Sequence, residues 1–275
     1  MEFDPTLDPI LPREGLHVVH LFFRIDYGQW DLLDARARIE AKTSLAQVVQ
    51  DIRAEADTQL LTFSVLTPKA DLGFMLLTPD LHRADLFSKR LGQALGPEVL
   101  SAEFAYFSMT ERSEYTTSEA EYSRSLESDE GLTAGSAEFE EKMETFRKRM
   151  AKYLKDRLEP NLPDWPVVCF YPMSKRRSGA ENWYSLDFPA RKALMAGHAR
   201  VGRTYSGRVL QLITGSTGLD DMEWGVTLFS HTASDIKSIV YEMRFDEVSA
   251  RYGEFGAFFI GLQMPLNALF TRLGI

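Results

Sequence analysis

The stretch QLLTFSVLTPKADLGFMLLTP, residues 59–79, decides the fold class. Its two apolar runs, QLLTFSVLTP (59–68) and LGFMLLTP (72–79), each have the length of a strand, and PKAD between them is typical of a turn. The stretch therefore predicts two consecutive strands with no helix between them. LHVVHLFFRIDY (16–27) before it and LSAEFAYFSM (100–109) after it predict two further strands.

Helical patterns lie between these strands. TSLAQVVQDIRAEAD (43–57) and LHRADLFSKRLGQALG (81–96) carry apolar residues at helical spacing. The first part of the chain thus has the order β-α-β-β-α-β, which is the ferredoxin-like arrangement. A polar segment, residues 110–137, follows with little apolar periodicity, and it predicts a long surface loop or lid.

The same order of elements recurs after a linker helix. SAEFEEKMETFRKRMAKYLKDRL (136–158) has acidic residues early and basic residues late, which favours a helix that stops before Pro160. Beyond it the patterns predict strands at 166–173, 208–215, 223–231 and 255–263, and helices at 188–205 and 232–252. We therefore expect an α+β fold in which a duplicated ferredoxin-like repeat forms a dimeric α+β barrel within one chain.

The expected division of the chain has three parts that form one compact body. Residues 1–15 are an N-terminal extension, and residues 16–137 are the N-terminal ferredoxin-like half with the polar loop. Residues 138–275 hold the linker helix and the C-terminal half. No run of apolar residues is long enough to span a membrane, and the acidic, proline-containing start does not look like a signal peptide, so we expect a cytoplasmic protein with no membrane partner.

Composition excludes several classes of function. The formal net charge of -9 argues against nucleic acid as a partner, because clustered basic residues bind a phosphate backbone. The single cysteine, Cys169, excludes an internal disulfide framework and a zinc site with several cysteines. The glycine-rich motifs of dinucleotide and P-loop sites and the G-x-S-x-G motif of many hydrolases do not occur.

A histidine occupies the apolar face of the helix expected at 188–205. Leu194, His198 and Val201 share one side of that helix by their spacing. A core histidine bonded to a backbone carbonyl is the ordinary explanation. A metal or heme ligand is the functional alternative, and a single histidine without a second ligand at i+3 or i+4 suits an axial heme position better than a zinc site.

Two strands of the second half carry polar groups among apolar ones. In 208–215, Gln211 either points to solvent or supplies a hydrogen-bonding group to an apolar cavity. Near 166–173, Tyr171, Met173 and Lys175 alternate onto one face, although Pro172 suggests a sheet edge or a strand end. A tyrosine on a sheet face is common in itself, but a phenol and an ammonium group side by side also suit redox and proton chemistry.

Basic residues offer a further, weaker signal. Arg157 could stabilise the end of the linker helix or bind a carboxylate. Arg244 lies among acidic residues and could simply form salt bridges. The basic residues at 175–177, 200, 203 and 208 form a basic neighbourhood in an acidic chain, which is either a solvated surface or the seat of an anionic small ligand.

Four runs carry a resemblance to a known family: YPMSKRR (171–177), NWYSL (182–186), ARKALMAGHARVGRTYSGRVLQLITGSTGLDDMEWGVTLF (190–229) and IVYEMRFDEVSARYGEFGAFFIGL (239–262). They resemble the chlorite dismutase-like superfamily, specifically its coproheme decarboxylase branch, also called hydrogen-peroxide-dependent heme synthases. The resemblance is dense from about residue 157 to 262 and looser before it. It implies the duplicated ferredoxin-like barrel, heme in the C-terminal half and a homopentamer.

The resemblance implies roles for eight residues. His198 matches the proximal iron ligand, Tyr171 the tyrosine that becomes a radical, and Lys175 a lysine that moves protons. Five further residues match the porphyrin pocket, with Gln211 on the distal side of the iron and the arginines and the serine at propionate groups: Arg157, Met173, Gln211, Arg244 and Ser249.

The implied reaction belongs to heme biosynthesis. Its substrate, iron coproporphyrin III (coproheme), also acts as the cofactor, and hydrogen peroxide is the oxidant. A radical at Tyr171 removes a hydrogen atom from a propionate, carbon dioxide leaves and a vinyl group remains; a second cycle gives heme b. Because chlorite dismutases carry a distal arginine, Gln211 disfavours chlorite chemistry. A chlorite dismutase or heme peroxidase, and a heme-binding protein without activity, are the alternatives.

Overall fold

The structure is a computed structural model that describes residues 7–275, so the first six residues of the expected N-terminal extension lie outside it. The strands are β1 (His17–Ile25), β2 (Gln59–Val65), β3 (Leu72–Thr78), β4 (Leu100–Thr110), β5 (Val167–Lys175), β6 (Val209–Gly215), β7 (Trp224–Ser230), β8 (Gly253–Phe255) and β9 (Phe259–Gln263). The helices are α1 (Tyr27–Leu32), α2 (Ala35–Ala54), α3 (Leu81–Gln93), α4 (Glu119–Ser128), α5 (Ala137–Leu158), α6 (Phe188–Arg203), α7 (Ala233–Met243) and α8 (Leu266–Leu273). Short 3₁₀ turns, Gly179–Glu181 and Trp183–Ser185, and a π-helical turn, Val248–Tyr252, complete the elements.

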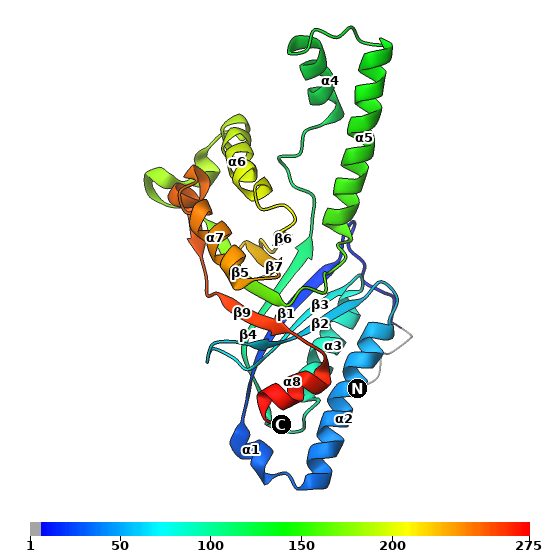
Figure 1. Ribbon diagram of the computed structural model, residues 1–275, viewed down its shortest axis with the longest axis vertical. Coiled ribbons are helices and arrows are strands. Elements are labelled where there is room, and N and C mark those ends of the chain that lie inside the picture. Colours follow the sequence, from blue (N-terminus) through cyan, green and yellow to red (C-terminus); the bar gives the residue numbers. More distant parts are fainter. Residues whose placement is uncertain (1–6) are drawn as a thin grey trace.

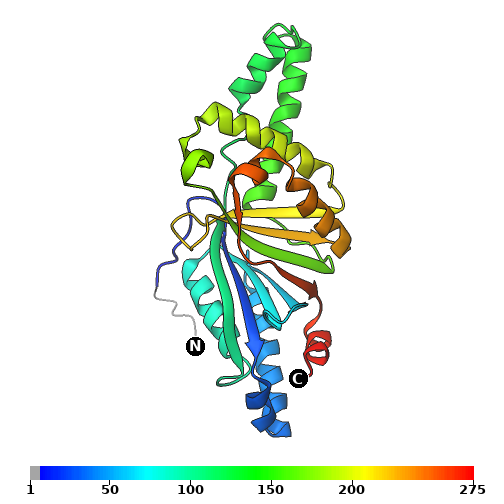
Figure 2. The same ribbon diagram turned by 90° about the vertical axis from the view of Figure 1, so that its left-hand side faces the viewer.

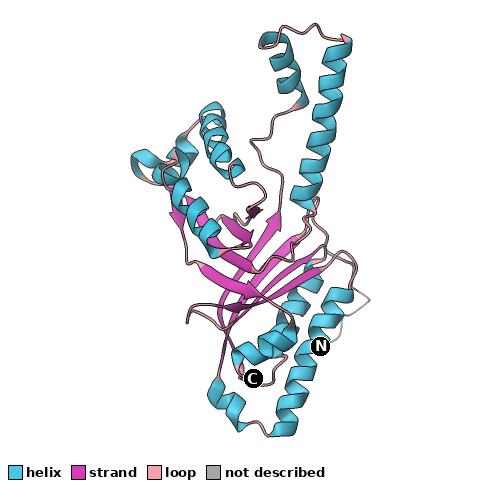
Figure 3. Ribbon diagram, in the orientation of Figure 1, coloured by secondary structure: helices cyan, strands magenta, loops and turns pink. Residues whose placement is uncertain are grey.

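The described strands form one sheet in which every ladder is antiparallel. Their order is β7-β6-β4-β1-β3-β2-β9-β5-β8, and β5 also pairs with β7, so the pairing returns to its first strand. Residues 59–79 form the neighbouring strands β2 and β3, as predicted. The sheet lies between two groups of helices (Figure 3), and the predicted α+β class is confirmed.

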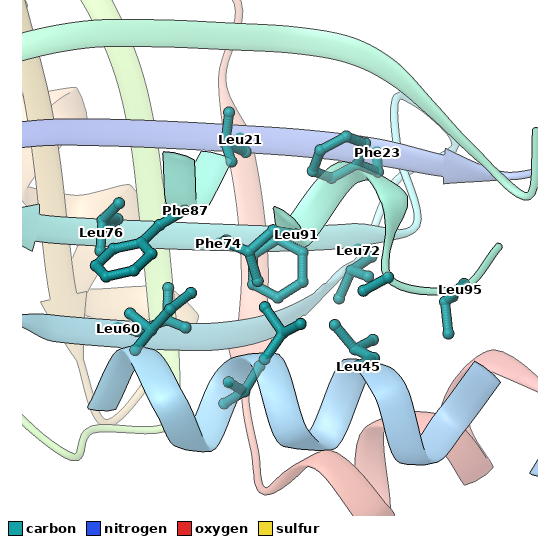
Figure 4. Close-up of a cluster of buried hydrophobic side chains, with 14 of the residues drawn as sticks. Leu21, Phe23, Leu45, Leu60, Leu72, Phe74, Leu76, Phe87, Leu91 and Leu95 are labelled. Atoms are coloured by element: carbon teal, nitrogen blue, oxygen red, sulfur yellow. The ribbon is translucent and has the colours of Figure 1, made fainter. Parts of the chain in front are cut away.

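Alternation along the strands builds separate cores on the two faces of the sheet. In β1, Leu21 and Phe23 face α2 and α3, whereas Phe22 packs in a second cluster with Phe63 and Phe170. The first cluster joins β1–β3 to the apolar stripes of α2 and α3 (Figure 4). On the other side of the molecule α6 and α7 lie over β5–β7 (Figures 1 and 2). The two groups of helices thus cover different parts of the sheet.

Strand β5 is not an edge strand and does not end at Pro172, contrary to the prediction. It runs on to Lys175 and pairs with β7 on one side and with β9 and β8 on the other. The partner changes from β9 to β8 between Phe170 and Met173, so the proline, which has no N–H to donate, lies at the gap between these two partners. As a result Tyr171 and Lys175 sit in a strand held on both sides.

The polar segment 110–137 is not one long loop, because it contains α4. Ser118 caps this helix through a reciprocal capping box with Glu121. Leu126 is buried against Phe139 and Met143 of α5, so a short apolar face packs on the linker helix. Figure 1 shows α4 and α5 projecting together from the rest of the molecule. A single buried residue, Leu126, in a ten-residue helix gives too little apolar periodicity to reveal the helix in the sequence.

Other boundaries also differ from prediction. Helix α2 begins at Ala35, eight residues earlier than expected, because Asp34 caps it and its first turns are solvated rather than apolar. The helix expected at 232–252 ends at Met243, and the chain then forms the π-helical turn Val248–Tyr252. Within residues 7–275, no helix combines the length and the apolar character that crossing a bilayer requires.

Candidate functional site

A cavity of about 470 Å³ lies between α6, α7, the last turns of α5 and the strands β5–β7. That volume is within the range of small-molecule and cofactor sites. The structure brings all eight residues singled out from the sequence to its wall: Arg157, Tyr171, Met173, Lys175, His198, Gln211, Arg244 and Ser249. They come from six segments of the chain, so the cavity exists only in the folded protein.

His198 is oriented by a buried carboxylate. Its Nδ1 lies 2.7 Å from Oδ2 of Asp246, and the side chains are 27% and 6% exposed respectively. The same oxygen accepts hydrogen bonds from the backbone N–H and the hydroxyl of Ser249. With Nδ1 donating to Asp246, Nε2 keeps its lone pair for a ligand in the cavity. The core-histidine explanation is therefore wrong, since the partner is an acid and the ring borders a cavity.

Tyr171 presents an unpaired phenol. Its ring stacks on Phe258 at 4.3 Å between centroids and lies 6.0 Å from Phe255. Burial raises the pKa of the Tyr171 hydroxyl, so the phenol keeps its proton at neutral pH. No group in residues 7–275 forms a hydrogen bond with this hydroxyl, although the residue lines the cavity. The O–H is thus available to a carboxylate or another acceptor in the cavity.

Lys175 is a buried cation further along β5. Burial lowers its pKa to about 8, and the negative charges of Asp246 and Glu223 partly oppose that effect. Its Nζ lies 5.0 Å from the ring centroid of Trp183, which is an attractive cation–π arrangement. A lysine with this pKa is charged at neutral pH and gives up its proton within the physiological range, as a proton carrier must.

Gln211 lines the cavity and does not point to solvent. Its neighbour on the same face, Ile213, also lines the cavity, whereas Leu212 packs in the cluster on the opposite face of β6. The amide reaches towards α6, where a Cβ on Gly202 would come within 3.1 Å of Nε2 of Gln211. A glycine at this position therefore lets the helix that carries His198 approach the strand that carries Gln211.

Two arginines offer cationic groups to the cavity. The Nε of Arg157 is buried and has no hydrogen-bond partner among the described residues, which is unusual for a buried donor. The guanidinium of Arg244 lies 3.7 Å from the centroid of the Phe255 ring, and no carboxylate of residues 7–275 forms an ion pair with it. The salt-bridge explanation for Arg244 is therefore wrong, and both arginines suit an anionic ligand.

The basic neighbourhood seen in the sequence does not reach the cavity as a unit. Arg176 and Arg208 form ion pairs with the acidic side chains of Glu254 and Asp235. Arg177 is largely exposed and lies 3.9 Å from the buried Glu223. Only Lys175 from this group lines the cavity. The remaining positive charge of the site comes from the helix α5 and from residues after α7 and β4.

Sequence reasoning missed several residues of the site. Asp246 lies two residues after Arg244, but only the turn after α7 brings it to His198. Glu111 and Tyr115 follow β4 and join the wall because β4 pairs with β6. Burial raises the pKa of the Glu111 carboxyl, against the influence of Arg157. Glu111 and Tyr115 could not be found without knowledge of the strand pairing, and Asp246 could not be found without knowledge of the turn after α7.

The donor set favours a porphyrin over a bare metal ion. Nowhere in the described part of the chain do three or more His, Cys, Asp or Glu side chains come together to hold a metal. A single neutral imidazole with a carboxylate partner instead matches axial ligation of heme iron. The unpartnered Arg157 donor and the free phenol of Tyr171 suit carboxylate groups at the porphyrin edge.

Comparison with known proteins gives consistent results. The family model described as "Chlorite dismutase" matches residues 38–264. A coproheme decarboxylase from Thermus thermophilus is 38% identical over 271 residues, which cover 98% of this chain and 98% of that protein. A solved heme-binding protein, also from Thermus thermophilus, has a TM-score of 0.79 and 37% identity, over 95% of this chain and 96% of that one. A longer protein from Natronomonas pharaonis is 38% identical over 97% of this chain, which spans 42% of its length.

Proposed function

The chain belongs to the chlorite dismutase family, and we propose that it is a coproheme decarboxylase. It converts two propionates of iron coproporphyrin III to vinyl groups with hydrogen peroxide and yields heme b. One observation carries the proposal: His198, the free phenol of Tyr171 and the unpartnered Arg157 donor line one cavity. A site that only binds the iron of a porphyrin would need only the histidine. A site that also acts on the carboxylate groups of the porphyrin uses the phenol and the arginine as well.

In this proposal each side chain has a defined task. His198 binds the iron through Nε2, and Asp246 fixes its ring and keeps the proton on Nδ1. Gln211 and Met173 line the cavity, where Gln211 would offer its amide on the distal side and Met173 would pack beside the porphyrin. Three residues of the wall would hold the anionic propionates: Arg157, Arg244 and Ser249.

The balance of the reaction explains why a proton donor is needed. Conversion of a propionate to carbon dioxide and a vinyl group releases two electrons and one proton. Reduction of hydrogen peroxide to two waters takes up two electrons and two protons. The bound iron porphyrin supplies the oxidising power. Tyr171 passes one oxidising equivalent to the propionate by removing a hydrogen atom from its β-carbon, and Lys175 delivers the proton that each turnover consumes.

We predict an alkaline limb in the pH profile of heme b formation. Lysine is protonated below its pKa, so a step that uses the Lys175 ammonium declines as the pH rises through about 8. The rate of heme b formation should be measured between pH 6 and 10 for the wild type and for Lys175→Met. The variant should keep a low residual rate without this limb. If Lys175→Met shows the same alkaline limb with the same midpoint, the limb belongs to the titration of another group.

We also predict that Arg157 contributes to recognition of carboxylates. Arg157→Met should weaken binding of coproporphyrin by about 10-fold to 100-fold, since a hydrogen bond to a charged group contributes about 1.5 to 3 kcal/mol. Binding of a porphyrin without carboxylates should change little. Arg149→Met is the matched control, because Arg149 lies on the same helix but does not line the cavity. Equal losses for both porphyrins would contradict the role of Arg157.

A heme carrier or a chlorite-degrading or peroxidase enzyme would use His198 in the same way but would not need Tyr171. The neutral Gln211 on the cavity wall disfavours chlorite chemistry, which uses a distal arginine in the resemblance described above. Oxygen release from chlorite by the heme-loaded protein, without loss of porphyrin mass in peroxide, would favour that alternative.

The architecture and assembly belong to the same proposal. The strand order and the two β-α-β-β-α-β series support a duplicated ferredoxin-like fold closed as a barrel in one chain. The proposed parts are the extension (1–15), the N-terminal half (16–137) and the C-terminal half with the linker helix (138–275). We expect a cytoplasmic homopentamer that binds neither nucleic acid nor membranes.

A further inference from the structure

Glu223 is a buried acid that makes unusually specific contacts next to the cavity. It precedes β7 and is 5% exposed. Its Oε2 accepts the backbone N–H of Lys175 at 2.8 Å, and its Oε1 accepts the hydroxyl of Tyr184 at 2.6 Å. Both carboxylate oxygens are therefore engaged, one by the end of β5 and one by the 3₁₀ turn Trp183–Ser185.

The first of these contacts replaces a backbone bond of the sheet. The pairing of β5 with β7 ends where Met173 lies opposite Trp224. Beyond this pair the side chain of Glu223, not its backbone, accepts the N–H of Lys175. The backbone of Glu223 is itself fixed, because its N–H donates to Ser174 and its carbonyl accepts from Ser216. The carboxylate thus holds the last residue of β5 on the side of β7, while β8 pairs with it on the other side.

The negative charge of Glu223 acts on the buried ammonium group of Lys175. Lys175 is 8% exposed, and the acidic groups whose charges act on it are Asp246 and Glu223. Asp246 already accepts hydrogen bonds from His198 and Ser249. The other cation near Glu223 is Arg177, at 3.9 Å and with a largely exposed side chain, so solvent screens it. A buried ammonium group needs a compensating charge, and Glu223 is placed to supply it.

We propose that Glu223 is a positioning residue for Lys175: it fixes the end of β5 through the Lys175 backbone and balances the buried ammonium with its own charge. The relevance of this role to decarboxylation rests on the function proposed above. Tyr184 donates a hydrogen bond to the second carboxylate oxygen and adds no charge at neutral pH, so its loss leaves the charge of Glu223 and the bond to the Lys175 backbone unchanged. The role itself belongs to the ligand-free protein and can be tested there.

The test is the rate at which acetic anhydride labels Lys175 in the ligand-free protein, followed by peptide mass spectrometry as a function of pH. Only the neutral amine reacts, so the curve reports the protonation of Lys175. Glu223→Gln keeps the size and an acceptor oxygen but removes the charge. We expect it to raise the labelling rate at pH 7 about 5-fold, which corresponds to a fall of about one unit from a pKa of about 8. Tyr184→Phe, the matched control, should stay within about 2-fold of the wild type.

Identical labelling curves for Glu223→Gln and the wild type would overturn the proposal. If Glu223→Gln does not fold, the double variant Glu223→Gln/Lys175→Met decides the question. Recovery of a cooperative thermal transition in the double variant would support charge balance, because it removes the uncompensated ammonium. Failure of the double variant to fold would overturn it, since the acid would then serve the fold and not the lysine.

The same variants separate this role from the proposed function. In coproheme-loaded protein, Glu223→Gln should move the alkaline limb of heme b formation to lower pH, in step with the labelling curve. A labelling shift without decarboxylation by any variant, the wild type included, would refute the proposed function and leave the role of Glu223 intact. Decarboxylation by Glu223→Gln with an unchanged alkaline limb, together with an unchanged labelling curve, would refute the role of Glu223 and leave the proposed function intact.

Discussion

Tyr171→Phe should bind coproheme normally and form essentially no heme b when hydrogen peroxide is added. The substitution removes only the hydroxyl, which carries the proposed hydrogen-atom transfer. We expect the rate to fall at least about 10³-fold, equivalent to about 4 kcal/mol of activation free energy. The measurement is the mass of the porphyrin after peroxide addition, together with a titration of coproheme into each ligand-free protein.

The structure explains why this variant should still fold. The Tyr171 hydroxyl has no hydrogen-bond partner in residues 7–275, and the stacked contact with Phe258 involves the ring that phenylalanine retains. Tyr205→Phe is the matched control, since Tyr205 is also buried in the cluster around β5–β7 but does not line the cavity. Normal heme b formation by Tyr171→Phe would refute the radical role of this tyrosine.

His198→Ala should lose the axial ligand and with it the absorption spectrum of an imidazole-bound ferric porphyrin. We expect coproheme affinity to fall by more than the about 10-fold to 100-fold that is typical of losing an outer-sphere partner of a metal ligand. Asp246→Asn should lower coproheme affinity only by about 10-fold to 100-fold, because an asparagine amide still orients the imidazole ring but lacks the negative charge of the aspartate. Coproheme titrations followed by absorption spectroscopy measure both.

Added imidazole gives this prediction a sharp control. It should restore the imidazole-bound spectrum in His198→Ala, since the cavity left by the side chain can admit it. His231→Ala should behave like the wild type, because His231 is exposed and its ring lies tilted against Trp165, and it does not line the cavity. An unchanged spectrum in His198→Ala without added imidazole would show that another residue binds the iron.

Features that depend on local periodicity could be predicted from the sequence. Residues 59–79 predict adjacent strands because both apolar runs have the length of a strand and a polar turn joins them. Gln211 and Ile213 share a face of β6 because side chains alternate along any strand. These inferences need only neighbouring residues. They put Gln211 and Ile213 on one face of the strand but left open whether that face meets solvent or a cavity.

Features that depend on contacts between distant parts of the chain could not be predicted from the sequence. Asp246 reaches His198 only through the break after α7 and the π-helical turn, which no periodic pattern encodes. Pro172 lies inside a strand because the partner on one side changes there, whereas a proline alone indicates an edge. Helix α4 depends on a capping box and on burial of Leu126 against α5, so composition alone suggested a loop.

The most direct test of the account is the porphyrin mass during a peroxide titration. The ligand-free protein is loaded with ferric coproheme, hydrogen peroxide is added in steps without oxygen, and the extracted porphyrin is analysed by mass spectrometry. The account predicts two successive losses, each of one carbon dioxide and two hydrogen atoms, that end at heme b. A porphyrin whose mass does not change, apart from bleaching, would contradict it.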